Sequence, residues 1–316
     1  MNIDKGLNYG IIGNCKSSAL INEDSSIDWC CLPQFDSSAI FCKIIDNHIG
    51  GSFKIEADES YIITQQYINN TAIVRTNFKN EKNEFEVLDF MTRYKLDDQN
   101  FYSPPEIQRL IKPIKGLPKI KVLYNPTLEY ANGKTETYEK EDFIVSVFDE
   151  ASYETLFLYT NIEKKKILEN KEFELSKSVY LNLSYNEKID LPSLSKSEEE
   201  FKKTQEYWLN WCKKSPSFKS YNKEITRSSI TLKLLTFEKT GAVLAAAGRT
   251  CDSTGGLVGL LAGGSGGTSS GKMVVCSANA GASGASGYLV FSFLSFRRFT
   301  LTVIAWSYKL MICEFI

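Results

Sequence analysis

The stretch Glu84-Phe85-Glu86-Val87-Leu88-Asp89-Phe90 decides the fold class of this chain. Phe85 and Val87 alternate with acidic residues, which is the two-residue period of a strand with one buried face. Shortly before it, Thr71–Phe78 is rich in β-branched residues, which also favour an extended backbone. Two such runs so close together indicate β structure rather than helix.

Further short runs of strand character occur on both sides of this stretch, separated by turn signals. Asn132-Gly133 is a dipeptide typical of a β-hairpin turn, so we expect a hairpin there. About ten strands with frequent turns predict a β-sandwich over residues 1–193. The other predicted strands are Ser26–Leu32, Gly51–Ile55, Tyr61–Thr64, Ile120–Tyr124, Phe143–Phe148, Thr155–Tyr159 and Ser178–Leu183.

The pattern changes to a helical one after the sandwich. Residues 195–214 predict a helix that Ser197 caps, with three glutamates in its first turn. Its apolar residues fall on one stripe. A second helix is predicted over residues 221–237, and Pro216 separates the two. A sandwich followed by helices indicates a second domain that has only begun.

Four segments in order resemble motifs of one known family: Tyr9–Cys15, Ser25–Phe41, Val87–Met91 and Thr231–Ala246. They resemble glycoside hydrolase family 15, in its bacterial and archaeal glucoamylase-like and trehalase-like members. The second segment is similar to the family's G-S-I-D-W-x-C-x-P-R-F-D-S-x-x-x-F. It departs from that pattern at Ser25, where the family has glycine, and at Gln34, where it has arginine.

The resemblance implies a super-β-sandwich over residues 1–193, a helical linker over 194–220 and then an (α/α)6 barrel. Residues 221–246 would form the first helix of that barrel, and the rest of the barrel is missing. Apolar side chains of the two helices would then lack part of their packing partners and be exposed, namely Trp208, Trp211, Leu232, Leu234 and Leu235.

The resemblance also implies hydrolysis of an α-glucoside, such as an α-glucan, dextran or trehalose. An inverting enzyme of this kind uses one carboxylic acid to protonate the leaving oxygen and a second carboxylate to activate water. The family resemblance implies two glutamates on barrel loops, and no position of this sequence aligns with either. We therefore assign no catalytic residue and expect this chain to be an inactive, truncated form.

The remaining site candidates are accessory and belong to the second motif: Asp28, Trp29, Phe35, Asp36 and Ser37. In one interpretation this segment faces the barrel and forms the rim of the substrate pocket, because aromatic faces suit sugars and short carboxylates suit hydroxyls. In the other, Trp29 and Phe35 are core residues, and Asp28 and Asp36 hold turns. His48, the one histidine, precedes two glycines and is expected in a turn.

The composition changes sharply near residue 241. Residues 241–316 hold 13 of the 20 glycines but only two of the 38 acidic residues, Asp252 and Glu314. A flexible linker before a small hydrophobic module would account for this. The absence of periodicity and caps instead favours a change of reading frame or a disordered segment over residues 247–316.

Bulk properties limit the remaining function classes. The net charge of −1 argues against a nucleic-acid partner. Arg297, Arg298 and Lys309 interrupt the apolar stretch 288–316, which makes a membrane span a weak alternative. The eight cysteines include no C-x-x-C pair, so we expect no metal site. We expect free thiols, as in a protein of the reducing cytoplasm. We also expect no cofactor.

Two further function hypotheses remain open beside the glycoside hydrolase. One is a non-catalytic β-sandwich that binds carbohydrate or a protein partner. The other is a fragment held at a membrane by residues 288–316.

Overall fold

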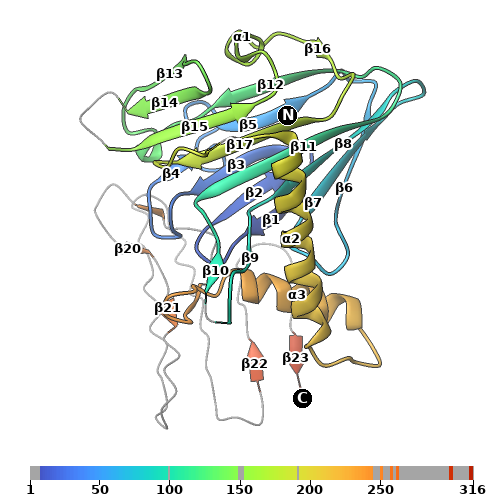
Figure 1. Ribbon diagram of the computed structural model, residues 1–316. Coiled ribbons are helices and arrows are strands. Elements are labelled where there is room, and N and C mark those ends of the chain that lie inside the picture. The colour runs from blue at the N-terminus through green and yellow to red at the C-terminus, as the bar shows by residue number, and fades with distance from the viewer. Residues whose placement is uncertain are drawn as a thin grey trace, which may run out of the picture.

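The computed structural model describes residues 8–98, 100–148, 153–190 and 192–244, together with five short strands beyond them. Two antiparallel sheets stack on each other as a β-sandwich, and two helices follow (Figure 1). This confirms the predicted fold class. Within the described residues there is no (α/α)6 barrel.

The first sheet has seven strands in the order β1-β2-β3-β5-β12-β16, with β4 paired to β3. Hydrogen bonds between the antiparallel pairs leave β1 on one edge and β16 on the other. Its strands are β1 (Tyr9–Gly13), β2 (Ser18–Asn22), β3 (Ser26–Cys31), β4 (Ala39–Phe41), β5 (Ser52–Glu56), β12 (Lys119–Asn125) and β16 (Phe173–Glu174).

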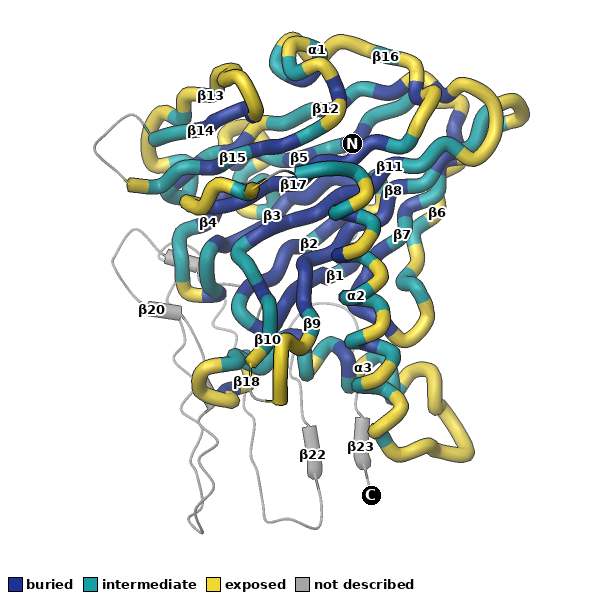
Figure 2. Tube along the Cα trace, in the orientation of Figure 1, coloured by how far each residue is buried: buried dark blue, intermediate teal, exposed yellow. Residues whose placement is uncertain are grey.

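The second sheet has eight strands in the order β13-β14-β15-β17-β11-β8-β7-β6. The strands β17 and β11 at its centre are buried over most of their length, as Figure 2 shows. Its strands are β6 (Ile62–Tyr67), β7 (Val74–Lys79), β8 (Glu84–Phe90), β11 (Glu106–Lys115), β13 (Thr135–Glu139), β14 (Ile144–Phe148), β15 (Thr155–Thr160) and β17 (Val179–Tyr185).

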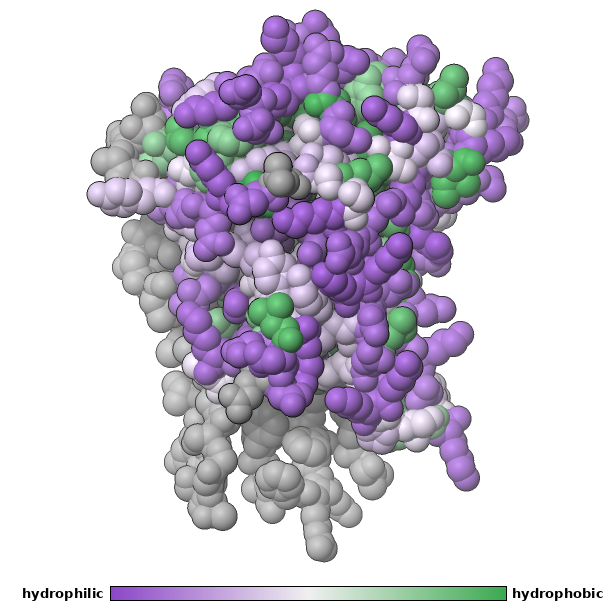
Figure 3. All heavy atoms as spheres, in the orientation of Figure 1, coloured by the Kyte–Doolittle hydropathy of each residue, from purple (hydrophilic) through white to green (hydrophobic). Residues whose placement is uncertain are grey.

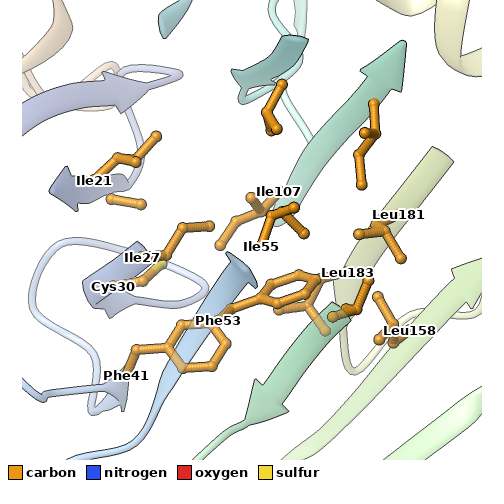
Figure 4. Packing of buried hydrophobic residues seen from close by; sticks show 14 of the residues in the cluster. Ile21, Ile27, Cys30, Phe41, Phe53, Ile55, Ile107, Leu158, Leu181 and Leu183 are labelled. Carbon is orange, nitrogen blue, oxygen red and sulfur yellow. The ribbon is translucent and has the colours of Figure 1, made fainter. Parts of the chain in front are cut away.

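The main core lies between the two sheets. Ile27, Phe53 and Ile55 of the first sheet point toward Ile107 and Leu183 of the second (Figure 4). These five side chains are fully shielded from solvent. Burial of apolar surface on this scale, at roughly 25 cal/mol per Å², is the main force that holds two sheets together.

Two helices extend the sandwich at its C-terminal side. The first, α2 (Leu194–Lys213), lies against the outer face of the second sheet, where it contacts β11 and β17. Phe201 packs edge-on against Phe90 there, at 5.6 Å between ring centroids. The second, α3 (Asn222–Leu234), reaches β1 and buries Ile230 and Leu234. The two helices are therefore packed on the sandwich.

The remaining short elements complete the chain. The pair β9 (Tyr94–Lys95) and β10 (Phe101–Tyr102) lies at the same end of the molecule as β18 (Val243–Leu244) in Figure 2. The rest are η1 (Glu129–Ala131), α1 (Lys164–Leu168), β19 (Thr250–Cys251), β20 (Leu257–Val258), β21 (Leu261–Ala262), β22 (Phe299–Leu301) and β23 (Cys313–Phe315).

Several local predictions were wrong. Asn132-Gly133 does not close a hairpin, because β12 and β13 on either side belong to different sheets. Ser193, not Ser197, caps α2: its hydroxyl accepts a hydrogen bond from the backbone N–H of Lys196 at 3.2 Å. Ser197 is buried within the helix, and the three glutamates follow the first turn.

The exposure predicted for the two helices was also largely wrong. Trp208 and Leu234 are fully buried, because they pack on Ala72 of the sandwich and on Ile230. Trp211 and Leu235 are half-buried, and only Leu232 is exposed, at 57%. His48 lies in an exposed turn, as predicted. The interpretation of residues 247–316 as out of frame or disordered concerns residues that, apart from the short strands β19–β23, lie outside the described part of the chain.

Candidate functional site

Asp28 lies within β3, not in a turn, and is buried. Its carboxylate accepts hydrogen bonds from Ser26 at 2.5 Å, from Asn22 at 2.9 Å and from the hydroxyl of Tyr9 at 3.1 Å. Burial, and then the nearby charge of Asp28, raise the pKa of Tyr9, so its hydroxyl remains a donor at neutral pH. The network fixes the start of the second motif.

Trp29 and Phe35 are both buried, at 4% and 3% exposure. Trp29 lies in a small cluster with Cys31, Ala39 and Cys42, and its ring is 6.5 Å from that of Tyr130. Phe35 packs edge-on against Phe237, 6.3 Å away, which belongs to the segment after α3. Phe35 thus joins the second motif to a part of the chain 200 residues later.

Asp36 and Ser37 form the outer part of this loop. Asp36 is exposed, while Ser37 is half-buried. The Ser37 hydroxyl accepts a hydrogen bond from the backbone N–H of Gln34 at 3.2 Å, and the Ser37 N–H donates to the Gln34 carbonyl at 3.1 Å. The loop is therefore a tight turn that presents the Asp36 carboxylate outward. Of the five candidates, Asp36 is the one free to meet a ligand.

The segment after α3 folds back onto the sandwich beside this loop. The Glu238 N–H donates to the carbonyl of Cys15 at 2.9 Å, and the Phe237 N–H to that of Ala242 at 2.7 Å. Lys239 Nζ donates to Gln34 Oε1 at 3.5 Å. Residues 237–239 are thus held between the loops that follow β1 and β3.

Arg93 is the centre of this junction and was not predicted from the sequence. It is 1% exposed, and its Nη1 donates to the carbonyl of Asn14 at 2.7 Å and to Glu238 Oε2 at 2.8 Å. Its Nε donates to the hydroxyl of Tyr207 on α2 at 3.0 Å. Its guanidinium also lies 4.3 Å from the centre of the Phe101 ring. Arg93 therefore ties the loop after β1 to α2 and to the segment after α3.

The surroundings of Glu238 shift the pKa of its carboxyl group. Burial acts to raise its pKa, but the hydrogen bond and the positive charge of Arg93 outweigh burial and hold the pKa below its ordinary value. Ser103 adds a second hydrogen bond to Oε2, at 3.2 Å. Glu238 is consequently an anion that fixes a structural junction. A glycosidase acid needs the opposite, a raised pKa.

A separate open cleft of about 440 Å³ lies at the edge of the sandwich where β1 faces β6. The hydroxyl of Tyr67 bridges the two sheets here, accepting from the N–H of Ile11 at 2.7 Å. Arg227 covers the Tyr67 ring at 3.8 Å. Exposed polar groups dominate the opening, which is lined by Asn8, Tyr9, Gly10, Glu23, Ile63, Gln65, Gln66, Tyr67 and Val74.

The described residues contain no cluster of three or more histidine, cysteine, aspartate and glutamate side chains suited to a metal ion. The five cysteines within residues 8–244 are free thiols: Cys15, Cys30, Cys31, Cys42 and Cys212. No helix among the described residues is both long enough and apolar enough to cross a bilayer. The view in Figure 3 shows a mostly hydrophilic surface with small, scattered hydrophobic areas.

Comparison with known proteins adds a family relationship. The family model "Trehalase-like, N-terminal" matches residues 7–179, more than half of the chain. Among similar proteins, the trehalase of Thermoplasma volcanium is 28% identical over 246 residues, covering 75% of this chain and 38% of that protein. Trehalase 2 of Sulfolobus acidocaldarius is 32% identical over 181 residues, covering 57% of this chain and 28% of its own length. The chain thus spans less than two fifths of these relatives.

Proposed function

We propose, since this chain belongs to the family of trehalase-like N-terminal domains, that its sandwich docks a helical catalytic domain and completes the substrate pocket of an α-glucoside hydrolase. Trehalose is the first substrate to test, because that is what the relatives' name indicates. Residues 1–193 would be the sandwich, 194–220 the linker and 221–246 the start of the helical domain.

One observation carries this proposal: the second motif touches the chain at the place where a helical domain would begin. Phe35 packs on Phe237, and Lys239 reaches Gln34. The turn that exposes Asp36 therefore lies beside residues 237–239 and would face a domain attached there. A short carboxylate in that position suits a sugar hydroxyl at the pocket rim.

The five motif residues would have two different roles. Asp36 and Ser37 would form the rim itself. Asp28, Trp29 and Phe35 are buried behind them and would hold the turn in place. No carboxylate pair for acid and base catalysis is assigned in residues 1–316, so the chain alone is expected to release no glucose from trehalose.

A chimera tests the proposal. Residues 8–246 of this chain would be fused to the part of the Thermoplasma volcanium trehalase that follows its matched region. We expect this chimera to hydrolyse trehalose and the same helical part without a sandwich to be at least tenfold slower. A folded chimera that releases no glucose, or a helical part that is equally active alone, would overturn the proposal.

A second candidate is a non-catalytic carbohydrate-binding sandwich, and the open cleft between β1 and β6 favours it. Its volume of about 440 Å³ suits a disaccharide, and its amide and carboxylate groups suit sugar hydroxyls. Calorimetric titration of the full chain with trehalose or maltotriose would test this. Binding that Gln66→Ala abolishes and Asp36→Ala leaves unchanged would favour this candidate over the first.

A further inference from the structure

A second group of buried polar side chains lies between α2 and the centre of the second sheet, bonded by Thr92 and Tyr94 on either side of Arg93. A small cavity of about 10 Å³, the size of one water molecule, separates them. Glu106 and Gln108 come from β11, Asn182 from β17 and Glu200 from α2. All four side chains are more than nine-tenths buried, at 7%, 2%, 5% and 7% exposure.

The side-chain amide nitrogens of this group already donate hydrogen bonds within it or to a neighbour. Gln108 Nε2 donates to Thr92 Oγ1 at 2.9 Å, and Asn182 Nδ2 donates to Glu106 Oε2 at 3.5 Å. These bonds fix the orientation of both amides, and neither amide oxygen has a hydrogen-bond partner. Tyr94 donates to Glu200 Oε1 at 3.2 Å.

Three oxygens around the cavity have no hydrogen-bond partner: Gln108 Oε1, Asn182 Oδ1 and Glu200 Oε2. A buried acceptor without a partner costs about 1–3 kcal/mol. One water molecule has two hydrogens and cannot satisfy three acceptors. A cation has no such limit, because it prefers to be surrounded by several oxygens.

We propose that this cavity binds a hard cation, with Ca²⁺ as the best match. Ca²⁺ accepts carboxylate and amide oxygens as ligands at about 2.3–2.6 Å, whereas Mg²⁺ retains several waters for which the cavity has no room. The site holds α2 on β11 and β17. It is independent of the carbohydrate chemistry proposed above.

The charges around the cavity agree with this assignment. Lys196 also lines the cavity, but its Nζ donates to the carbonyl of Asp190 at 3.1 Å. Two buried carboxylates facing one such cation leave a local excess of negative charge, which a divalent ion neutralises.

Terbium luminescence tests the site in the full chain. Tb³⁺ replaces Ca²⁺ in oxygen sites and emits when a nearby tyrosine is excited. Tyr102 lines the cavity, and Tyr94 bonds Glu200. At pH 8 we expect one equivalent of sensitised Tb³⁺ that Ca²⁺ displaces and a hundredfold excess of Mg²⁺ does not.

Neutral isosteric variants separate a cation site from a packing role. Glu106→Gln and Glu200→Gln should lower Ca²⁺ affinity roughly tenfold or more and abolish the rise of Tm that Ca²⁺ produces. Both should stay folded in EDTA, because they remove a buried charge. Glu199→Gln, on the exposed side of the same helix, should retain the wild-type response.

Three outcomes would overturn the assignment. The first is no sensitised emission and no change of Tm with Ca²⁺, which would mean an ordered water or a protonated carboxyl only. The second is equal loss of binding in Glu199→Gln. The third is unchanged binding in both Glu106→Gln and Glu200→Gln.

Discussion

Arg93 Nη1 lies 2.8 Å from Glu238 Oε2, although the two residues are 145 positions apart in the chain. Arg93 follows β8 in the sandwich, and Glu238 follows α3. Their pairing fixes the point where the chain leaves the sandwich. Because Arg93 is almost fully buried, its positive charge is compensated by the Glu238 carboxylate and by the carbonyl of Asn14.

Removing Arg93 should destabilise the folded chain strongly. Arg93→Ala leaves Glu238 without its buried partner and also removes the contacts to Tyr207 and Phe101, so we expect a loss of about 3–5 kcal/mol in the free energy of unfolding. Urea unfolding measures it, with Glu224→Gln on the exposed start of α3 as control. A loss of less than about 1 kcal/mol would show that the junction contributes little.

The pairing also predicts acid sensitivity. The pKa of Glu238 is lowered in the fold, so its contribution to stability is present above its unfolded pKa of about 4.3 and is lost as the pH falls through the folded value. Glu238→Gln should therefore be less stable than wild type at pH 7, and the difference should shrink below pH 4. A pH-independent difference between the two proteins would contradict this.

The raised pKa of Glu106 predicts that its contribution to folding stability depends on pH in the opposite direction to that of Glu238. Its pKa of about 7 in the fold lies above the unfolded value of about 4.3, so the folded state holds the proton more tightly. The contribution of Glu106 to the free energy of unfolding is at its full value below about pH 4.3 and is lost as the pH rises through about 7. In EDTA, Glu106→Gln should remove this loss between pH 5 and pH 8, while Glu199→Gln should keep it. Equal pH profiles of Glu106→Gln and wild type would contradict the prediction.

The cap of α2 offers a local test. The Ser193 hydroxyl satisfies the N–H of Lys196, so Ser193→Ala should cost about 1 kcal/mol of stability. Ser176→Ala, at an exposed position outside the helix, serves as the control and should cost less than about 0.5 kcal/mol. If the two variants unfold at the same urea concentration, the cap does not stabilise α2.

Most strands could be predicted from the sequence, including β3 and β17, which are buried along their whole length, whereas β11 could not. Phe85 and Val87 of β8 alternate with acidic residues, and that run was recognised. The sequence of β11 gives no strand signal, because polar residues occupy buried positions in it, among them Gln108 and Arg109. Arg109 is neutralised by Asp89 at 2.7 Å, a partner from the neighbouring strand that no local pattern reveals.

The same reason limits prediction of the site. The second motif could be identified from the sequence alone, because its residues form one continuous stretch. Arg93, Glu238 and the oxygens of the buried cavity come from distant segments, and each looks like an ordinary polar residue alone. The separation of buried Phe35 from exposed Asp36 also required the structure, because neighbouring residues of a turn give no periodic signal.

The position of Asp36 beside the substrate is best tested by kcat/KM for trehalose in the chimera described above, measured with Asp36→Ala and without it. We expect Asp36→Ala to lower kcat/KM about tenfold, equivalent to ~1.4 kcal/mol in transition-state stabilisation, with the free energy of unfolding unchanged. Asp46→Ala, another aspartate of an exposed sandwich turn, should leave kcat/KM unaltered. A kcat/KM that Asp36→Ala and Asp46→Ala leave equally unchanged would contradict the claim that this turn faces the substrate.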